Sequence, residues 1–332
     1  MTHIRMNAKA LIDQILQAKY CGDFFEEGNE NSIRSKFLEC AKLVHPDVCS
    51  DPRAEEAFNH LAKLNDQAME CIRLGCWDET DMLRLPGKPK IRYRHSIWFE
   101  LGARYITDDQ VIWVLDSNKE KYLKRYVQTK LTYKDSKMAA MYKDRMPIVT
   151  DFTDRAIFIR KDPKEFPMDL FLSAYGDKLT ARDIAWMISR MCDLLCFLKV
   201  IQGLTLNGIE PENLFINPDT HTISIYGGWW YATKIGHEMI GVSKNIYNIM
   251  PFDIRNTKIA SPATDIESVR VMFQRICEGK DIPKPMNNWL NAGSLEDPIE
   301  EYERWNEALD KSWGQRKFMV FSANADEIYS QN

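Results

Sequence analysis

The stretch Leu43-Val44-His45-Pro46-Asp47-Val48 lies between two segments whose apolar residues recur at helical spacing. A proline disfavours helical geometry at the residue before it, so a helix that reaches Val44 is expected to end at His45. The residues that follow are predicted to form an exposed loop that carries an imidazole and a carboxylate two positions apart. What this loop can do depends on the two segments beside it.

Both flanking segments predict amphipathic helices. The first spans about 32–44 and carries Arg34, Lys36 and Lys42 on its polar face. Its apolar stripe consists of Ile33, Phe37, Cys40, Ala41 and Val44. The second is expected to begin near Pro52, where a proline suits the first helical position. Its stripe consists of Ala54, Phe58, Leu61, Leu64, Ala68 and Ile72. Two such helices joined by a short loop are expected to pack antiparallel.

With a shorter helix predicted over about 8–19, these features resemble the J-domain, the module that defines DnaJ-type co-chaperones. The resemblance covers 1–76. It implies that His45, Pro46 and Asp47 dock on a DnaK-type heat-shock chaperone and stimulate its ATPase, with electrostatic support from Arg34, Lys36 and Lys42. A carboxylate can pair with an arginine, and a basic helix speeds encounter with an acidic partner. The alternative is a helical hairpin whose turn happens to contain these residues, because Pro and Asp are common in turns.

The composition is typical of a soluble globular protein, with 332 residues, 45% hydrophobic, 28% charged and a formal net charge of −4. This charge predicts no general affinity for nucleic acid or anionic membranes. We expect a cytoplasmic protein, because no apolar run is long enough for a membrane span and the first residues lack a signal-peptide pattern. Eight cysteines fit a reducing compartment. Cys71 and Cys76 have no second pair at zinc-ligand spacing, so no metal site is expected.

The middle of the chain predicts a linker and then a small sheet. Residues 77–92 are interpreted as the linker because they are rich in Pro, Gly and Lys. Residues 93–165 are predicted to form a mostly antiparallel sheet with one helix within 132–145. The strands are expected at 97–99, 111–115, 121–127, 148–149 and 156–159.

One segment of this region leaves a second function open. Residues 119–145 contain nine Lys plus Arg and three Asp plus Glu, interleaved with Tyr122, Tyr126, Tyr133 and Tyr142. Basic and aromatic residues together can bind single-stranded nucleic acid by charge and stacking. The competing interpretation is a solvated sheet edge and helix face.

The last region, 166–332, is predicted to be mainly helical. A long helix is expected over 183–202, and another is expected to begin near Ala263 and to end near Gly279. Between them, two short strands joined by a tight turn at 217–219 are predicted. Trp229-Trp230 is interpreted as core or as part of a partner groove.

A small sheet, a long helix, Pro211-Glu212-Asn213 before a β-hairpin and Asp265 in a later helix resemble a bilobal protein kinase fold. The fold class implied for the whole chain is α+β and multidomain, an all-α J-domain hairpin followed by this fold. The implied divisions are a J-domain over 1–76, a linker over 77–92, a small β lobe over 93–165 and a helical lobe over 166–332. Asp265 would brace the loop that corresponds to the catalytic loop, which is a structural role.

Phosphoryl transfer on this fold needs a catalytic aspartate, metal ligands and a strand lysine. The base position falls on Gly208, which has no side chain, and the metal-binding aspartate on Tyr226, a poor Mg²⁺ ligand. No glycine-rich loop is present, and a glutamate partner for the lysine is missing. Lys124 is placed at the strand lysine position, and Asn213 is the metal ligand that remains.

We therefore expect a co-chaperone rather than an enzyme, without cofactor or metal, whose pseudokinase-like region recruits a client protein. No membrane partner is expected. One alternative is an atypical phosphotransferase that binds ATP and Mg²⁺ through Lys124 and Asn213. The other is the nucleic-acid-binding adaptor built on 119–145.

Overall fold

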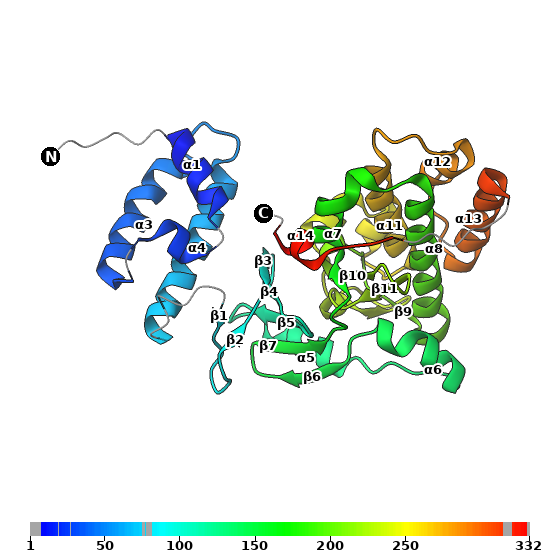
Figure 1. The fold of residues 1–332 in the computed structure, drawn as a ribbon, viewed down its shortest axis with the longest axis horizontal. Coiled ribbons are helices and arrows are strands. Elements are labelled where there is room, and N and C mark those ends of the chain that lie inside the picture. The colour runs from blue at the N-terminus through cyan, green and yellow to red at the C-terminus, as the bar shows by residue number, and fades with distance from the viewer. Residues whose placement is uncertain are drawn as a thin grey trace. The chain divides into compact units, whose positions relative to one another are not determined.

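A computed structural model of the chain describes residues 8–18, 20–26, 28–74, 77, 82–314 and 321–330. The chain divides into two compact units, 1–96 and 97–332. The first unit is helical and includes a short ribbon, and the second is a mixed α/β unit with a sheet lobe and a helical lobe (Figure 1). The division lies four residues after the end of the predicted linker.

The described residues of the helical unit form α1 (Ala8–Gln17), α2 (Cys21–Phe24), α3 (Glu30–Val44) and α4 (Ala54–Leu74). α3 begins where the Asn29 side chain accepts hydrogen bonds from the backbone N–H groups of Asn31 and Ser32, at 2.9 and 3.3 Å. It ends at His45, whose ψ of 131° is extended, as expected before Pro46. The three predicted helices are therefore confirmed, although α4 begins at Ala54 rather than at Pro52.

The apolar stripes of these helices meet in one core. Its buried members include Leu11, Ile12, Ile15, Ile33, Cys40, Val44, Ala57, Leu61, Leu64 and Ala68. α3 and α4 pack against each other, and α1 packs against both. Burial of these side chains is the main source of stability of the unit, because each fully buried aliphatic side chain contributes roughly 1.5–3 kcal/mol.

The predicted linker over 77–92 is not without structure. β1 (Met82–Leu83) pairs antiparallel with β2 (Ile91–Arg92). The turn between them is closed by a hydrogen bond from Lys88 N–H to Leu85 O, at 3.0 Å. Gly87 in this turn has a φ of 72°, a conformation that glycine adopts without strain.

The sheet lobe of the second unit is built on a five-stranded sheet in the order β3-β4-β5-β7-β6. Its strands are β3 (His95–Phe99), β4 (Gly102–Ile106), β5 (Gln110–Leu115), β6 (Val149–Phe152) and β7 (Ala156–Arg160). The pairs β4–β5, β5–β7 and β7–β6 are antiparallel. The strands predicted at 97–99, 111–115, 148–149 and 156–159 are confirmed, with ends that differ by up to three residues.

β4 is a strand that the sequence pattern does not predict. It lacks a run of branched residues, and Arg104 lies in its interior, fully buried. The guanidinium of Arg104 pairs with both carboxylate oxygens of Asp169, at 3.0 and 2.8 Å. This two-point pairing is what allows a charge to be buried in the strand.

The strand predicted over 121–127 is wrong, because these residues form the helix α5 (Glu120–Gln128). Leu123 and Tyr126 are three positions apart and are both buried, which is the spacing of a helix face. Lys124 lies on the exposed face of the same helix. It is therefore not a strand lysine, and the role assigned to it by the kinase resemblance is not supported by its position.

The helical lobe follows the sheet. The helix predicted within 132–145 is confirmed as α6 (Ser136–Tyr142), which lies between β5 and β6 in the chain. The helices that follow the sheet are α7 (Met168–Tyr175), α8 (Ala181–Phe197), α9 (Lys244–Ile249), α10 (Phe252–Thr257), α11 (Pro262–Cys277), α12 (Lys284–Leu290), α13 (Pro298–Trp313) and α14 (Ala325–Tyr329). The short strands of the helical lobe are β8 (Phe166–Pro167), β9 (Leu204–Thr205), β10 (Leu214–Asn217), β11 (Thr222–Ile225) and β12 (Thr233–Lys234). β10 and β11 form the predicted hairpin, and α11 confirms the helix predicted to begin near Ala263.

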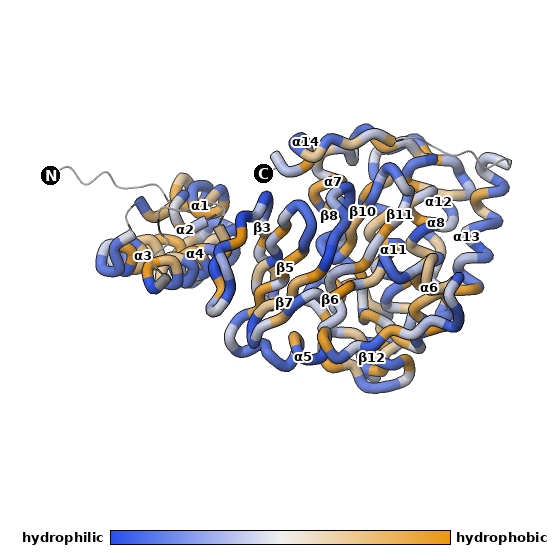
Figure 2. Tube along the Cα trace, turned by 60° about the horizontal axis from the view of Figure 1, so that its bottom comes forward, coloured by the Kyte–Doolittle hydropathy of each residue, from blue (hydrophilic) through white to orange (hydrophobic). Residues whose placement is uncertain are grey.

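The helix predicted over 183–202 is confirmed as α8 and a following π-helical turn, Leu198–Gln202. α8 begins with a capping box, in which the side chains of Thr180 and Asp183 each bond the other's backbone N–H. α8 and α11 run side by side through the lobe (Figure 1). Hydrophobic residues also concentrate along the strands β5 and β7 of the sheet, as Figure 2 shows.

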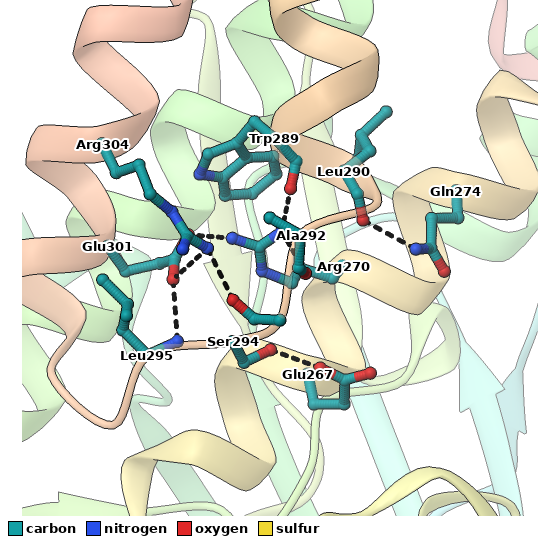
Figure 3. A network of polar contacts seen from close by, with 11 residues as sticks. Glu267, Arg270, Gln274, Trp289, Leu290, Ala292, Ser294, Leu295, Glu301 and Arg304 are labelled. Carbon is teal, nitrogen blue, oxygen red and sulfur yellow. Dashed lines mark hydrogen bonds and ion pairs between the residues drawn. The ribbon is translucent and has the colours of Figure 1, made fainter.

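A buried polar network ties α11 to the segments after it (Figure 3). Arg270 and Glu301 form an ion pair with almost no exposure to solvent. The Arg270 guanidinium also donates to the backbone oxygens of Trp289 and Ala292, and Glu301 accepts from Leu295 N–H at 3.0 Å. These bonds supply partners for groups that could not otherwise be buried.

No helix in the described part of the chain combines the length and the hydropathy that a bilayer crossing requires.

Candidate functional site

The first candidate site is the loop that joins α3 to α4. The backbone oxygen of His45 accepts hydrogen bonds from Val48 N–H and Cys49 N–H, at 2.9 and 2.8 Å, so the loop is a compact turn. The His45 ring packs edge-on against Phe58 of α4, with ring centroids 5.1 Å apart. The imidazole therefore anchors the loop to the hairpin, and Pro46 and Asp47 are presented to solvent.

Asp47 carries the exposed carboxylate of this loop. His45 Nδ1 accepts a hydrogen bond from Asp47 N–H at 3.2 Å. The Asp47 carboxylate is 3.7 Å from the same nitrogen and is 87% exposed, against 41% for the His45 side chain. It makes no ion pair with Lys or Arg within the described residues. A carboxylate held in this way can accept two hydrogen bonds from the guanidinium of a partner protein.

A row of exposed side chains leads along α3 to this loop. Arg34, Leu38 and Lys42 are spaced by four positions and so share one face of the helix. Arg34 pairs with Glu30 at 2.9 Å, and Lys42 makes no hydrogen bond or ion pair with another described residue. Leu38 is more than half exposed. The predicted basic face thus includes an apolar residue that the sequence pattern did not single out.

Lys36 lies on a different face of α3 and makes its contacts inside the helical unit. Its Nζ donates to the backbone oxygen of Phe24 at 2.6 Å and lies 4.9 Å from the centroid of the Phe24 ring. It therefore caps the end of α2 rather than pointing into solvent. Of the three predicted cations, Arg34 and Lys42 share the outward row with Leu38, and Lys36 fixes α2 to α3.

Arg53, which the sequence pattern did not single out, positions the start of α4. Its guanidinium bonds Asp13 of α1 at 2.7 Å and Asp51 at 3.2 Å. These partners raise the pKa of Arg53 above its ordinary value. The signal available in the sequence was Asp51-Pro52-Arg53 itself, but its distant partner Asp13 could not be identified without the fold.

The second candidate site is the loop over 205–213 in the helical lobe. Asp265 is buried in α11 and accepts from Thr205 Oγ1, Leu206 N–H and Gly208 N–H, at 2.7, 3.0 and 2.7 Å. Ser268 Oγ accepts from Ile209 N–H at 2.9 Å. Asp265 thus braces this loop. Burial raises the pKa of its carboxyl to about 6 in spite of these hydrogen bonds.

Gly208 cannot be replaced by a residue with a side chain without a local shift. Its φ is 115°, and a Cβ built on it would lie 2.4 Å from Cγ2 of Ile246. The position predicted for a catalytic base therefore has neither a carboxylate side chain nor the space for one.

Tyr226, at the position predicted for the metal-binding aspartate, makes its side-chain contacts inside the core. Its hydroxyl donates to Glu165 Oε2 at 2.7 Å, and burial together with this carboxylate raises the pKa of the phenol. Its backbone oxygen accepts from Trp113 Nε1 at 2.9 Å and from Tyr126 OH at 2.5 Å. Tyr226 is a core residue that joins the sheet to the helical lobe.

Four rings fill the space between the sheet and the segment that follows β11. We call Phe99, Trp113, Tyr126 and Trp230 the aromatic cluster. Trp230 lies 4.9 Å from Trp113, 5.1 Å from Phe99 and 5.8 Å from Tyr126, between ring centroids. Trp113, Tyr126 and Trp230 are buried. Trp230 is therefore core, which is one of the two interpretations of Trp229-Trp230.

The two residues predicted for nucleotide or metal binding, Lys124 and Asn213, lie in different surroundings. Asn213 is buried, and its side chain packs so close to Gly227 that a Cβ there would lie 2.1 Å from its Oδ1. Lys124 is exposed on α5, and no hydrogen bond or ion pair of the described residues joins the two. No group of three metal-ligating side chains is found in the described part of the chain. Cys76 lies outside the described residues.

Three of the four tyrosines of the basic segment are engaged inside the second unit. Tyr126 is buried, and Tyr142 and Tyr133 stack on Phe197 of α8 with centroids 4.2 and 6.0 Å apart. Arg145 is also buried and pairs with Asp193 at 2.7 Å. These positions count against the nucleic-acid alternative.

A cavity of about 420 Å³ lies in the helical lobe between α7, the 209–212 loop, α9 and α11. Its apolar wall includes Ile209, Ile246 and Met272. Glu210 and Glu212 also line it, and burial is the main cause that raises the pKa of both carboxyls. Neither carboxylate makes an ion pair with a described residue. The cations Arg275 and Lys280 also line the cavity, but neither forms an ion pair with Glu210 or Glu212. The cavity therefore combines apolar surface with two carboxylates that a further cation would stabilise.

No protein-family model and no curated protein matches the chain. Among solved structures, the chain is similar to one described as the structure of vaccinia related kinase 3, with a TM-score of 0.40 and 14% identity. The similarity covers 69% of this chain and 75% of that chain. A likeness at this level transfers neither an activity nor a ligand.

Proposed function

We propose that the helical unit is a J-domain-type module that docks on a DnaK-type chaperone through His45, Pro46 and Asp47 and stimulates its ATPase. The observation that carries the proposal is the exposed Asp47 carboxylate, held at the end of the row formed by Arg34, Leu38 and Lys42. This surface offers an acceptor for an arginine, two cations for an acidic patch and one apolar contact. Interfaces of this kind gain association rate from charge and affinity from a few close contacts.

The decisive experiment is single-turnover ATP hydrolysis by a DnaK-type chaperone, with and without the full chain. Stimulation is expected with the native chain and is expected to be lost with Asp47→Asn, which removes one charge from the loop. Asp66→Asn is the matched control, because Asp66 is an exposed aspartate on α4 that is not in the loop. Equal stimulation by the native chain and by Asp47→Asn would contradict the proposal.

We propose further that the second unit is a catalytically inactive, kinase-like region that binds a client or another protein. The strand order β3-β4-β5-β7-β6 and the loop braced by Asp265 support the fold resemblance. Gly208 and the aromatic cluster support the absence of catalysis, because a nucleotide would have to displace buried rings. The expected cost is several kcal/mol, since each buried aromatic ring contributes roughly 2–3 kcal/mol or more.

A thermal-shift measurement with Mg-ATP tests this second proposal. We expect the melting temperature of the full chain to stay unchanged at saturating nucleotide, because a ligand that binds only the folded state must raise it. A concentration-dependent rise would contradict the proposal and would favour the phosphotransferase alternative.

The cavity beside Glu210 and Glu212 is the part of this region best suited to a partner. A side chain with an apolar stem and a cationic end, such as that of arginine, would satisfy both its wall and its carboxylates. Binding of arginine-containing peptides to the full chain, compared with citrulline-containing peptides, measures this preference. Glu212→Gln is expected to remove the preference, and equal binding of the two peptides by the native chain would exclude it.

A further inference from the structure

Two thiols meet inside the helical unit although they are far apart in the sequence. Cys21 Sγ, at the start of α2, lies 3.9 Å from Cys71 Sγ, near the end of α4. The contact is not isolated, because Gln67 Oε1 accepts a hydrogen bond from Cys21 N–H at 2.7 Å. Gln67 and Cys71 are four positions apart on α4 and so lie on one helix face. α2 is thus held against this face at two adjacent points.

The geometry points to a reversible disulfide between Cys21 and Cys71 that forms when the chain meets a peroxide. The sulfur atoms need to approach by about 1.9 Å to reach bonding distance, which rotation of the two side chains and a small movement of the four-residue helix α2 can supply. Cys71 is half-buried and accessible to a small oxidant, whereas Cys21 is buried behind it. Disulfides in reducing compartments are commonly transient and act as redox sensors.

The reaction balances with hydrogen peroxide as the only oxidant. The Cys71 thiolate attacks one peroxide oxygen, the O–O bond breaks, and the products are a sulfenic acid on Cys71 and a hydroxide ion. The hydroxide takes up the proton that the Cys71 thiol released when it ionised, which gives one water molecule. The Cys21 thiol then attacks the Cys71 sulfur, its proton leaves with the hydroxyl group as a second water molecule, and the S–S bond forms. Two thiols are oxidised by two electrons in all, and one peroxide is reduced.

The bond would act on the docking surface through α2. Lys36 of α3 donates to Phe24 O at the end of α2, so fixing α2 to α4 also fixes this contact to α3. The closed loop would run from residue 21 to residue 71 and would include α3 and the His45-Pro46-Asp47 loop. A cross-link across a loop of this length restricts the unfolded state strongly. We therefore expect oxidation to make the helical unit more resistant to opening.

Several other thiols of the chain are poorly suited to this chemistry. Burial raises the pKa of the Cys196 thiol to about 12 and that of the Cys277 thiol to about 11, so their thiolate fractions are small. Burial also raises the pKa of Cys40 and of Cys192. Cys76 is close to Cys71 in the sequence and is the competitor that the experiment must separate.

The test treats the full chain with graded hydrogen peroxide, blocks the remaining thiols and maps cross-linked peptides by mass spectrometry. A 21–71 cross-link is expected in the native chain and in Cys76→Ser, with loss of two of the eight thiols. It is expected to be absent from Cys71→Ser and to be reversed by dithiothreitol. A 71–76 cross-link, or oxidation of Cys71 beyond the sulfenic acid without any cross-link to Cys21, would overturn the inference.

A second measurement separates the bond from a general effect of oxidation. Hydrogen exchange of the α2 and α3 amides is expected to slow at least several-fold in the oxidised native chain and in oxidised Cys76→Ser. No slowing is expected in peroxide-treated Cys71→Ser. Equal exchange rates in reduced and cross-linked chains would show that the bond does not brace the unit. Neither measurement requires the chaperone, so failure here is distinguishable from failure of the docking proposal.

Discussion

Gly208 shows at the scale of one residue how the fold excludes a side chain from one position of the 205–213 loop. Its backbone has a positive φ, and Ile246 of α9 fills the space in which a Cβ would lie. Both conditions must change before an aspartate could act there. A single substitution that places an aspartate at position 208 is therefore expected to damage the loop.

Gly208→Ala is predicted to destabilise the fold by about 2–5 kcal/mol, from left-handed strain and the clash with Ile246. Urea unfolding measures the change. Gly236→Ala is the matched control, because Gly236 also has a positive φ of 81° but no atom within 4 Å of the place that a Cβ would take. Its expected cost is the strain alone, about 1–2 kcal/mol. Similar losses for the two variants would show that the contact with Ile246 is unimportant.

Asp265 predicts a pH dependence of stability. Its pKa of about 6 in the folded state is above the ordinary value of 3.8, so the folded state holds this proton more tightly than the unfolded state does. Between about pH 4 and pH 6 the group is protonated when folded and ionised when unfolded. Stability from this group is therefore present below pH 4 and is lost as the pH rises to 6, by at most about 3 kcal/mol.

The measurement is the free energy of unfolding of the native chain and of Asp265→Asn, each from pH 4 to pH 7. The free energy of unfolding of the native chain minus that of the variant is expected to fall through this range and to level off above pH 6. Taking the difference cancels the other carboxyls of the chain. A difference that rises with pH would show that the three hydrogen bonds to Asp265 outweigh its burial.

At the scale of elements, the ends of helices are the features that local sequence specifies best. Pro46 ends α3 and Asn29 begins it, and both effects act within a few residues. The identity of α5 was harder to predict, because the segment 121–127 contains Tyr122, Tyr126 and Val127, which are residue types common in strands. Burial of Leu123 and Tyr126 together is decided by the core of the second unit, which the local pattern does not reveal.

Thr180→Ala is predicted to cost about 1 kcal/mol, because it removes one half of the capping box at the start of α8. Urea or thermal unfolding of the second unit within the full chain measures it. Thr257→Ala is the control, since Thr257 is exposed and its hydroxyl bonds only near neighbours. Its effect is expected within about 0.5 kcal/mol. A loss for Thr180→Ala as small as that of the control would argue against the cap.

At the scale of the whole molecule, each unit has its own core and its own candidate site. The helical unit presents charged and apolar groups on α3 and its loop. The second unit fills the space between sheet and helices with rings and retains a cavity in its helical lobe. This division is consistent with the two proposals above, in which one unit contacts an ATPase and the other binds a protein partner.

Arg270 and Glu301 are predicted to be essential for the helical lobe (Figure 3). Arg270→Met leaves Glu301 buried with less compensation and is expected to destabilise the second unit by about 3–5 kcal/mol. The double variant Arg270→Met, Glu301→Gln is expected to be more stable than Arg270→Met alone, because the unpaired charge is gone. Unfolding free energies of both variants and of Glu301→Gln complete a double-mutant cycle. Additive losses would show that the two residues do not depend on each other.

The candidate sites were predicted from the sequence to different degrees. The His45-Pro46-Asp47 loop was located, because a proline and two flanking stripes are local signals, but Leu38 and the inward role of Lys36 were not. Asp265 was placed as a brace, and it bonds the loop as expected. The strand position of Lys124 was wrong. Over a segment of seven residues, a helix face with two buried members is a weak local signal.

The sequence by itself determined α1, α3 and α4 of the first unit, the loop between α3 and α4 and the missing side chain at Gly208, but not the short helix α2. These features follow from periodicity, from proline and from glycine, which act on neighbouring residues. Only the tertiary structure decided the burial of Arg104, the aromatic cluster, the cavity beside Glu210 and the meeting of Cys21 with Cys71. Each depends on contacts between residues that are dozens of positions apart, and the core of each unit selects these contacts by packing that no local pattern encodes.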